Sequence, residues 1–226
     1  MDKYLRVCLT EAEVDERMTK WHPHVEDYYV ESDGGCDLGI TFRDITGRDY
    51  DELDDTFSDV VYGDGESTLA ETLYEALRSR NMKLATAESL TGGMIAAAIV
   101  DVPGASEVFY GGIVAYTEAA KIEKLGVLDS TLGECGAVSG ETAVEMATGM
   151  LSDMVSVAVS ATGLAGPGGG SALKPVGLTY IAVADDEHTE VYEHRFYGDR
   201  DEIRRQARDY ALFYVIRHLE EYFRLQ

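Results

Sequence analysis

Ala85-Thr-Ala-Glu-Ser-Leu-Thr-Gly-Gly93 joins two segments of different hydrophobic pattern. Residues 83–85 are typical of the end of a strand, and Met94-Ile-Ala-Ala-Ala-Ile-Val100 is typical of a buried helix. The hydroxyl and glycine residues therefore fall at a strand-to-helix turn, where a ligand can approach the backbone closely and the first helical amides lack partners. Two interpretations stay open: Ser89 or Thr91 caps the helix, or the turn binds an anion.

Outward from this turn, strands and helices alternate through most of the second part of the chain. We expect strands at 109–117, 155–161, 176–184 and 190–196, the last two as a hairpin, and helices from residue 67, at 118–125, at 140–152 and at 199–223. This alternation predicts an α/β domain with a mixed sheet that is covered by helices on both faces.

The N-terminal part is a smaller and more acidic unit. A helix at 11–21, strands at 27–31 and 37–43, and a second helix at 49–61 predict a small α+β domain. Tyr62-Gly-Asp-Gly-Glu66 interrupts the pattern, so we expect domains at 1–65 and 66–226.

Charge and composition exclude several classes of protein. The net charge is -23, and residues 1–66 carry 19 acidic against 6 basic side chains, which opposes binding to nucleic acid. No apolar run is long enough for a membrane span or a secretory signal, so we expect a cytoplasmic protein without a membrane partner. Three widely spaced cysteines predict neither disulfides nor a metal centre, and we expect no cofactor.

Three loops carry the residues suited to chemistry: 88–93, 116–121 and 162–170. Two of them follow strands, and ligands of α/β sheets collect at strand ends. The known glycine motifs do not fit, because no Gly-Lys-Ser/Thr follows and the third glycine of the dinucleotide fingerprint is missing. Tyr116 and Lys121 lie one position too far apart for the Tyr-x-x-x-Lys pair of short-chain reductases.

A hydroxyl nucleophile in the first loop would need a base. The three histidines of the second domain fall in a hairpin turn, a strand and a helix, away from the glycine loops. Lys121 follows a strand end by one helical turn, and burial can lower the pKa of a lysine enough for it to act as a base. The alternative is that Lys121 is an ordinary exposed helix residue.

Seven strings in order resemble the C-terminal domain of the CinA family, which includes the stand-alone nicotinamide mononucleotide deamidases. The strings are Ala87-Glu-Ser-Leu-Thr-Gly-Gly93, Val102-Pro-Gly-Ala-Ser106, Gly111-Gly-Ile-Val-Ala-Tyr116 through Lys121, Gly136-Ala-Val-Ser139, Thr162-Gly-Leu-Ala-Gly-Pro-Gly-Gly169, Lys174-Pro-Val-Gly177 and Gly198-Asp-Arg200. Residues 4–63 resemble, with weaker motifs, the small KH-like middle domain of full-length CinA.

The resemblance implies hydrolysis of nicotinamide mononucleotide to nicotinic acid mononucleotide and ammonia, a reaction of pyridine nucleotide salvage. It implies Ser89 as nucleophile, Lys121 as base and Tyr116 as the group that orients it, with amides near 91–93 stabilising the oxyanion. It also implies contacts to the nucleotide from the glycine loops, with Arg200 as a charge partner of the phosphate. The substrate-binding residues expected on this basis are Glu88, Thr91, Gly92, Gly93, Gly111, Gly112, Thr162, Gly163, Gly166 and Arg200.

Leu90 departs from the family pattern, which usually has cysteine there. This motivates an alternative, a catalytically reduced nucleotide-binding module of a CinA-type competence/damage-inducible protein. RNA binding by the N-terminal unit is opposed by its charge and by the lack of a Gly-x-x-Gly clamp. The resemblance and the aromatic-rich last helix predict a homo-oligomer, a dimer or larger.

Overall fold

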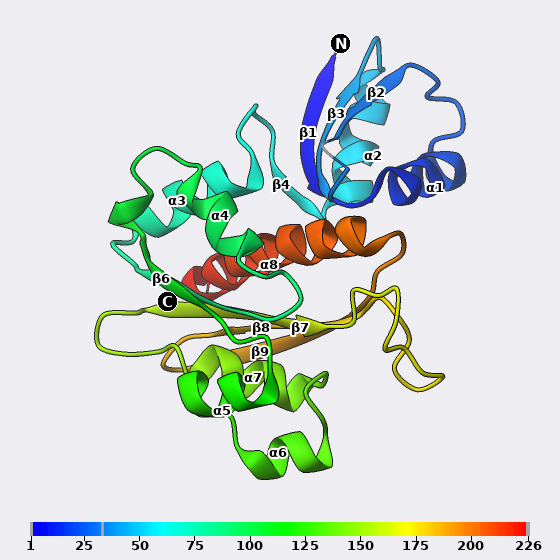
Figure 1. Cartoon of the computed structure of the whole chain (residues 1–226). Coiled ribbons are helices and arrows are strands. Elements are labelled where there is room, and N and C mark those ends of the chain that lie inside the picture. The colour runs from blue at the N-terminus through cyan, green and yellow to red at the C-terminus, as the bar shows by residue number, and fades with distance from the viewer. Residues whose placement is uncertain (1, 33, 225–226) are drawn as a thin grey trace. The chain divides into compact units, whose positions relative to one another are not determined.

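The computed structural model describes residues 2–32 and 34–224, which divide into two compact units, 1–72 and 73–226 (Figure 1). Helix α3 (Leu69–Ser79) contains the point of division, and the expected boundary between 65 and 66 stays a prediction. Among the described residues, no helix combines the length and the apolar character that crossing a bilayer demands.

The N-terminal unit is a four-stranded antiparallel sheet with two helices. Its elements are β1 (Lys3–Cys8), α1 (Glu11–Trp21), β2 (Tyr28–Glu31), β3 (Asp37–Phe42), α2 (Gly47–Phe57) and β4 (Val61–Gly63). The strand order is β2-β3-β1-β4, so β3 lies between β1 and β2 in a split β-α-β arrangement. Both helices begin at a capping box, Thr10 with Glu13 and Thr46 with Asp49.

The expected order of helix, strand, strand and helix is confirmed in this unit, but two strands were not predicted. In β1 the charged Lys3 and Arg6 are buried, because the amine of Lys3 donates to the Tyr50 carbonyl (3.0 Å) and Nε of Arg6 donates to the Tyr62 hydroxyl (2.8 Å). Helix α2 ends at Phe57 rather than near Val61, since residues 61–63 form β4 and pair with β1.

The second unit contains a five-stranded sheet, with β6 and β9 at its edges. Its elements after α3 are β5 (Leu84–Glu88), α4 (Met94–Val100), a short 3-10 helix (Ala105–Glu107), β6 (Phe109–Val114), α5 (Glu118–Leu125), α6 (Asp129–Glu134), α7 (Gly140–Thr148), β7 (Val157–Gly163), β8 (Leu178–Ala184), β9 (Thr189–Arg195) and α8 (Arg200–Arg224). Helices α4 and α5 have their predicted bounds, α7 is shorter than predicted, and α6 was not predicted.

The order of this sheet is β6-β5-β7-β8-β9. Strand β5 pairs in parallel with β6 and β7, and the other two pairings are antiparallel, so the predicted mixed sheet is confirmed. Figure 1 shows α4 and α8 on one face and α5 and α7 on the other. Because β5, β6 and β7 run in parallel, the residues that follow their C-terminal ends lie at one edge of the sheet, where loops of α/β folds bind ligands.

Candidate active site

Ser89 lies directly after the buried strand β5, at the C-terminal edge of the parallel strands. Its amide donates to the Ala161 carbonyl of β7 (2.9 Å), and its own carbonyl accepts from the Gly92 amide (3.2 Å), which closes a tight turn. Gly92 (φ 61°) and Gly93 (φ 97°) have left-handed backbone conformations that glycine adopts without strain. The predicted strand-to-helix turn is therefore confirmed, although the strand extends as far as Glu88.

Glu88 is the residue that caps the helix after this turn. Its buried carboxylate accepts hydrogen bonds from the amides of Gly93 (2.8 Å), Ile95 (3.1 Å) and Ala96 (2.8 Å). The capping interpretation is wrong, because no Ser89 or Thr91 side chain caps the helix. Anion binding at the turn stays a prediction, and it would have to use amides other than the three that Glu88 engages. The amide of Gly93 is likewise not available to an oxyanion.

Lys121 faces Ser89 across this edge of the sheet. Thr117 caps helix α5, because its hydroxyl accepts from the Ala120 amide (3.2 Å). Lys121 follows in the first turn of this helix and is only 1% exposed. The Lys121 amine donates to Oγ of Ser89 (2.9 Å) and to the Ala115 carbonyl (2.7 Å). The structure therefore brings together the serine and the lysine that the sequence singled out.

Burial changes the acid-base behaviour of this lysine. Desolvation lowers the pKa of Lys121 to about 8, against a smaller opposing effect of the Glu118 carboxylate. A lysine with that pKa is about one-tenth neutral at pH 7, and the neutral amine can accept a proton from the hydroxyl that it contacts. The pair has the chemical properties of an activated nucleophile.

Tyr116 and Arg200 form a bridge beside this pair. The Tyr116 side chain is exposed, and its hydroxyl accepts from Nη2 of Arg200 (3.0 Å), while Nη1 of Arg200 donates to the Gly166 carbonyl (2.6 Å). The hydrogen bonds of the Lys121 amine go to Ser89 and Ala115, so the orienting contact that was expected from Tyr116 comes from the Ala115 carbonyl.

A cavity of about 190 Å³ opens over Ser89. Its lining residues come from four loops, from α5, from the end of β7 and from the start of α8: Ser89, Leu90, Tyr116, Lys121, Ala137, Val138, Thr162, Gly163, Ala165 and Arg200. Of the expected substrate-binding residues, Thr162, Gly163 and Arg200 line this cavity. The others lie outside the lining: Glu88, Thr91, Gly92, Gly93, Gly111, Gly112 and Gly166.

Gly111 and Gly112 belong to strand β6 rather than to a ligand loop. A Cβ atom on Gly112 would lie 2.3 Å from Oγ1 of Thr86, so glycine is needed there for the packing of β6 beside β5. The close backbone approach that the sequence suggested is thus a contact between strands at Gly112, whereas a Cβ atom on Gly111 would meet no atom within 4 Å.

Two supporting interactions were not predicted from the sequence. The Lys174 amine donates to the carbonyls of Cys135 (2.7 Å) and Val138 (2.8 Å), which fixes the wall that Ala137 and Val138 contribute. The second is made by Arg204, whose guanidinium donates to the carbonyls of Leu90 and Thr91. The string at 136–139 was the one sequence signal for this wall.

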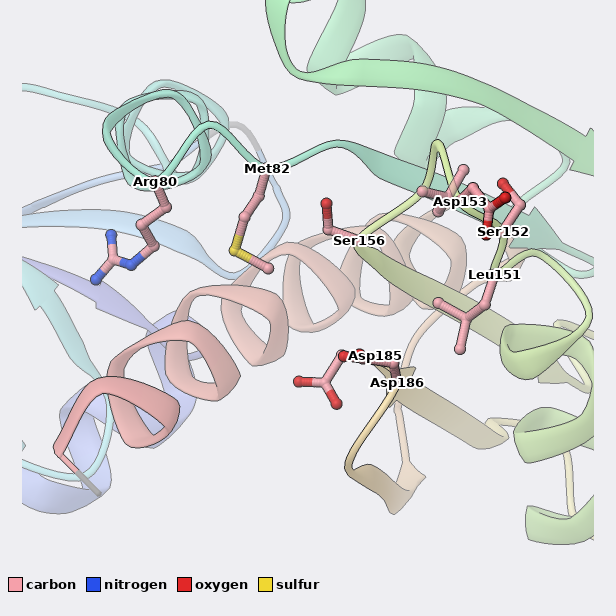
Figure 2. A pocket seen from close by; sticks show the side chains of 9 residues that line it. Arg80, Met82, Leu151, Ser152, Asp153, Ser156, Asp185 and Asp186 are labelled. Atoms are coloured by element: carbon pink, nitrogen blue, oxygen red, sulfur yellow. The ribbon is translucent and has the colours of Figure 1, made fainter. Parts of the chain in front are cut away.

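A larger hollow of about 660 Å³ lies at the opposite ends of β5 and β7 (Figure 2). Met82 and Ser156 precede these strands, and Asp185 follows β8. The Asp185 carboxylate accepts hydrogen bonds from the amides of residues 187 and 188 and pairs with Nε2 of His218 (3.0 Å). It therefore stabilises the hairpin turn between β8 and β9. The hydroxyls of Ser152 and Ser156 in the lining of this hollow accept backbone amides (3.3 Å each), and no described hydrogen bond joins either to a lysine amine or a carboxylate, so the Ser89 cavity is the stronger candidate site.

Within residues 2–32 and 34–224, no group of three His, Cys, Asp or Glu side chains is arranged to hold a metal ion.

Comparison with known sequences gives matches that include this site. Residues 66–219 match the CinA C-terminal domain family. A CinA-like protein of Kosmotoga olearia is 43% identical over 169 residues, which is 74% of this chain and 41% of its own. A CinA-like protein of Fusobacterium nucleatum is 40% identical over 172 residues, which is 75% of this chain and 42% of its own. A relative from Halothermothrix orenii is 36% identical over 227 residues, 95% of this chain and 54% of its own. The chain thus spans about half the length of these relatives.

Solved structures agree with the sequence matches. The competence/damage inducible protein CihA from Agrobacterium tumefaciens has a TM-score of 0.65 and 42% identity, covering 67% of this chain and 93% of that one. A CinA superfamily protein from Enterobacter cloacae has a TM-score of 0.64 and 31% identity, covering 70% and 96%. Residues 66–219, which match the family model, include Ser89, Lys121 and Arg200, and the chain belongs to the CinA family.

Proposed function

We propose that the Ser89 cavity hydrolyses the carboxamide of nicotinamide mononucleotide to give nicotinic acid mononucleotide and ammonia. The observation that carries the proposal is the 2.9 Å contact between Oγ of Ser89 and the buried amine of Lys121, whose pKa is lowered to about 8. A serine held beside a base with a pKa near neutrality is an arrangement that can catalyse amide hydrolysis.

The reaction follows from these groups. Neutral Lys121 takes the hydroxyl proton as Oγ of Ser89 attacks the amide carbon, and it then gives this proton to the leaving nitrogen, which departs as ammonia. A water then attacks the acyl ester, transfers a proton to Lys121 and releases the acid, and Ser89 recovers its proton. The Ala115 carbonyl, 2.7 Å from the amine, holds Lys121 in place throughout.

The oxyanion would be stabilised by amides of the turn itself. Within the described part of the chain, the amides of Leu90 and Thr91 have no hydrogen-bond acceptor, whereas those of Gly92 and Gly93 are engaged. Two free donors immediately after a nucleophile are typical of an oxyanion hole. The proposed oxyanion donors are therefore the amides of residues 90 and 91, instead of those expected at 91–93.

The size of the cavity supports a particular orientation of the nucleotide. A volume of about 190 Å³ is below the roughly 300 Å³ at which sites for drug-sized ligands begin. It suits the pyridine ring with its carboxamide, and the ribose phosphate would extend outward past Tyr116 to the guanidinium of Arg200. Arginine is well suited to a phosphate because its planar fork offers paired donors.

The test is incubation of the purified protein with nicotinamide mononucleotide, with ammonia and nicotinic acid mononucleotide measured separately. Equal amounts of both products, their loss in Ser89→Ala, and little turnover of free nicotinamide would support the proposal. Product formation that persists in Ser89→Ala, or comparable turnover of free nicotinamide, would contradict it.

One observation favours a second candidate, a nucleotide-binding module with reduced turnover. Leu90, which stands where the family usually has cysteine, lines the cavity and is buried. Titration calorimetry with nicotinamide mononucleotide distinguishes the two, because this module would bind the nucleotide without releasing ammonia.

A further inference from the structure

Arg204, in helix α8, contacts the backbone of the turn that follows Ser89. It lies one helical turn after Arg200 in α8, and its side chain is 26% exposed. Its Nε donates to the Leu90 carbonyl (2.9 Å) and its Nη2 to the Thr91 carbonyl (3.0 Å). Two adjacent donors of one rigid guanidinium thus bind two consecutive carbonyls.

These two bonds also fix the direction of the amides in the turn. In a planar trans peptide, the C=O of one residue and the N–H of the next point in opposite directions. A hydrogen bond to the Leu90 carbonyl therefore sets the direction of the Thr91 N–H, and the bond to the Thr91 carbonyl sets that of Gly92. Within the turn itself, the Gly92 amide donates to the Ser89 carbonyl (3.2 Å), and Arg204 adds a contact from α8 to the two carbonyls that follow.

We propose that Arg204 is a positioning residue that holds the Thr91 amide toward the oxyanion formed at Ser89. This inference rests on the proposed amide hydrolysis. Arg204 does not line the cavity, so it acts through the peptide planes at 90–92 and not by touching the substrate. A contact 3.8 Å from Nη1 of Arg204 to Asp201 supports the guanidinium on its other side.

The test is Arg204→Lys, which keeps the positive charge and loses the fork that binds both carbonyls. Loss of an oxyanion donor lowers kcat by roughly 100- to 1,000-fold, and a misdirected donor should lower it by about 10- to 100-fold. KM for nicotinamide mononucleotide should stay within about twofold, since the nucleotide does not meet Arg204. Arg204→Gln, which keeps a single donor group, should show a loss in the same direction.

Arg217→Lys is the matched control. Arg217 lies on the same helix, its side chain is 29% exposed, and it pairs with Glu220 away from the cavity. This variant should keep the wild-type kcat. If Arg204 only stabilised the fold, its variants would have a lower Tm than the control, but their kcat would stay within twofold of wild type at a temperature where all are folded. That result would overturn the proposal.

Amide hydrogen exchange separates this inference from the proposed reaction. Peptides that span 89–93 should exchange faster in Arg204→Lys than in the wild type or Arg217→Lys, whether or not any substrate is turned over. If the wild-type protein releases no ammonia, the proposed function fails and exchange still decides whether Arg204 holds the turn. Unchanged exchange at 89–93 in both Arg204 variants would overturn the positioning role.

Discussion

Lys121 must lose its proton before it can take one from Ser89, so the reaction rate should follow the titration of this amine. With a pKa of about 8, the amine is about one-tenth neutral at pH 7 and about nine-tenths neutral at pH 9. The active form is the deprotonated one, so kcat/KM should rise roughly tenfold between these pH values and then level off. A flat profile from pH 7 to 9 would refute Lys121 as the base.

Glu118→Gln is the variant that should move this profile. The carboxylate of Glu118, in the first turn of α5, raises the pKa of Lys121, so its removal should lower that pKa. Because Glu118 is exposed, water and salt screen its charge, so the pKa of Lys121 should fall only modestly. At pH 7 the neutral fraction and kcat/KM should rise, while the plateau at high pH stays unchanged.

The assay is ammonia release from nicotinamide mononucleotide between pH 6 and 10. Glu123→Gln is the control, because Glu123 is an exposed carboxylate of the same helix that pairs with Lys124 (2.6 Å). The shift in Glu118→Gln should grow at low ionic strength, as an exposed charge interaction does. An inflection that stays in place, or that moves to higher pH, would refute the reasoning.

The other predictions concern single side chains and assembly. Ser89→Ala and Lys121→Ala should each remove most turnover and the double variant little more, because residues that act as one unit are not additive; additive losses in initial-rate assays would contradict this. Arg200→Ala should raise KM at least tenfold with a smaller change in kcat, and an unchanged KM would place the phosphate elsewhere. Glu88→Gln should lower the free energy of unfolding by about 1 to 2 kcal/mol, seen as a lower urea midpoint. Light scattering should give a mass at least twice 24.7 kDa; a monomer would contradict the expected homo-oligomer.

Regular patterns account for the parts of the fold that could be predicted. Helices α4 and α5 have their predicted bounds because α4 is apolar throughout and follows two glycines, while α5 begins after the hydroxyl of Thr117 and ends before Gly126. Strand β1 was not predicted, since Lys3 and Arg6 look like surface residues until their partners at Tyr50 and Tyr62 are known. Such partners lie 47 and 56 residues away, where local patterns carry no information.

The same distinction applies to the site. Ser89 and Lys121 could be found because each closely follows a strand, and parallel strands bring their C-terminal ends to one edge. The roles of Glu88 and Arg204 could not be predicted. The Glu88 side chain folds back onto the start of the next helix, and Arg204 contacts a carbonyl more than a hundred residues away in the sequence. The sequence located the reactive groups, whereas only the folded backbone identifies what holds them.

The cap made by Glu88 also bears on where the phosphate of a nucleotide can bind. A helix start normally attracts anions through its free amides and its dipole, and the sequence pointed to this turn for that reason. Here a buried carboxylate already takes three of those amides, so a phosphate would find fewer donors and a negative charge. The guanidinium of Arg200, which lines the same cavity, donates to the Gly166 carbonyl and the Tyr116 hydroxyl, and within the described part of the chain it pairs with no carboxylate. For the proposed reaction, this difference in charge favours a nucleotide bound with its carboxamide beside Ser89 and its phosphate on the Arg200 side.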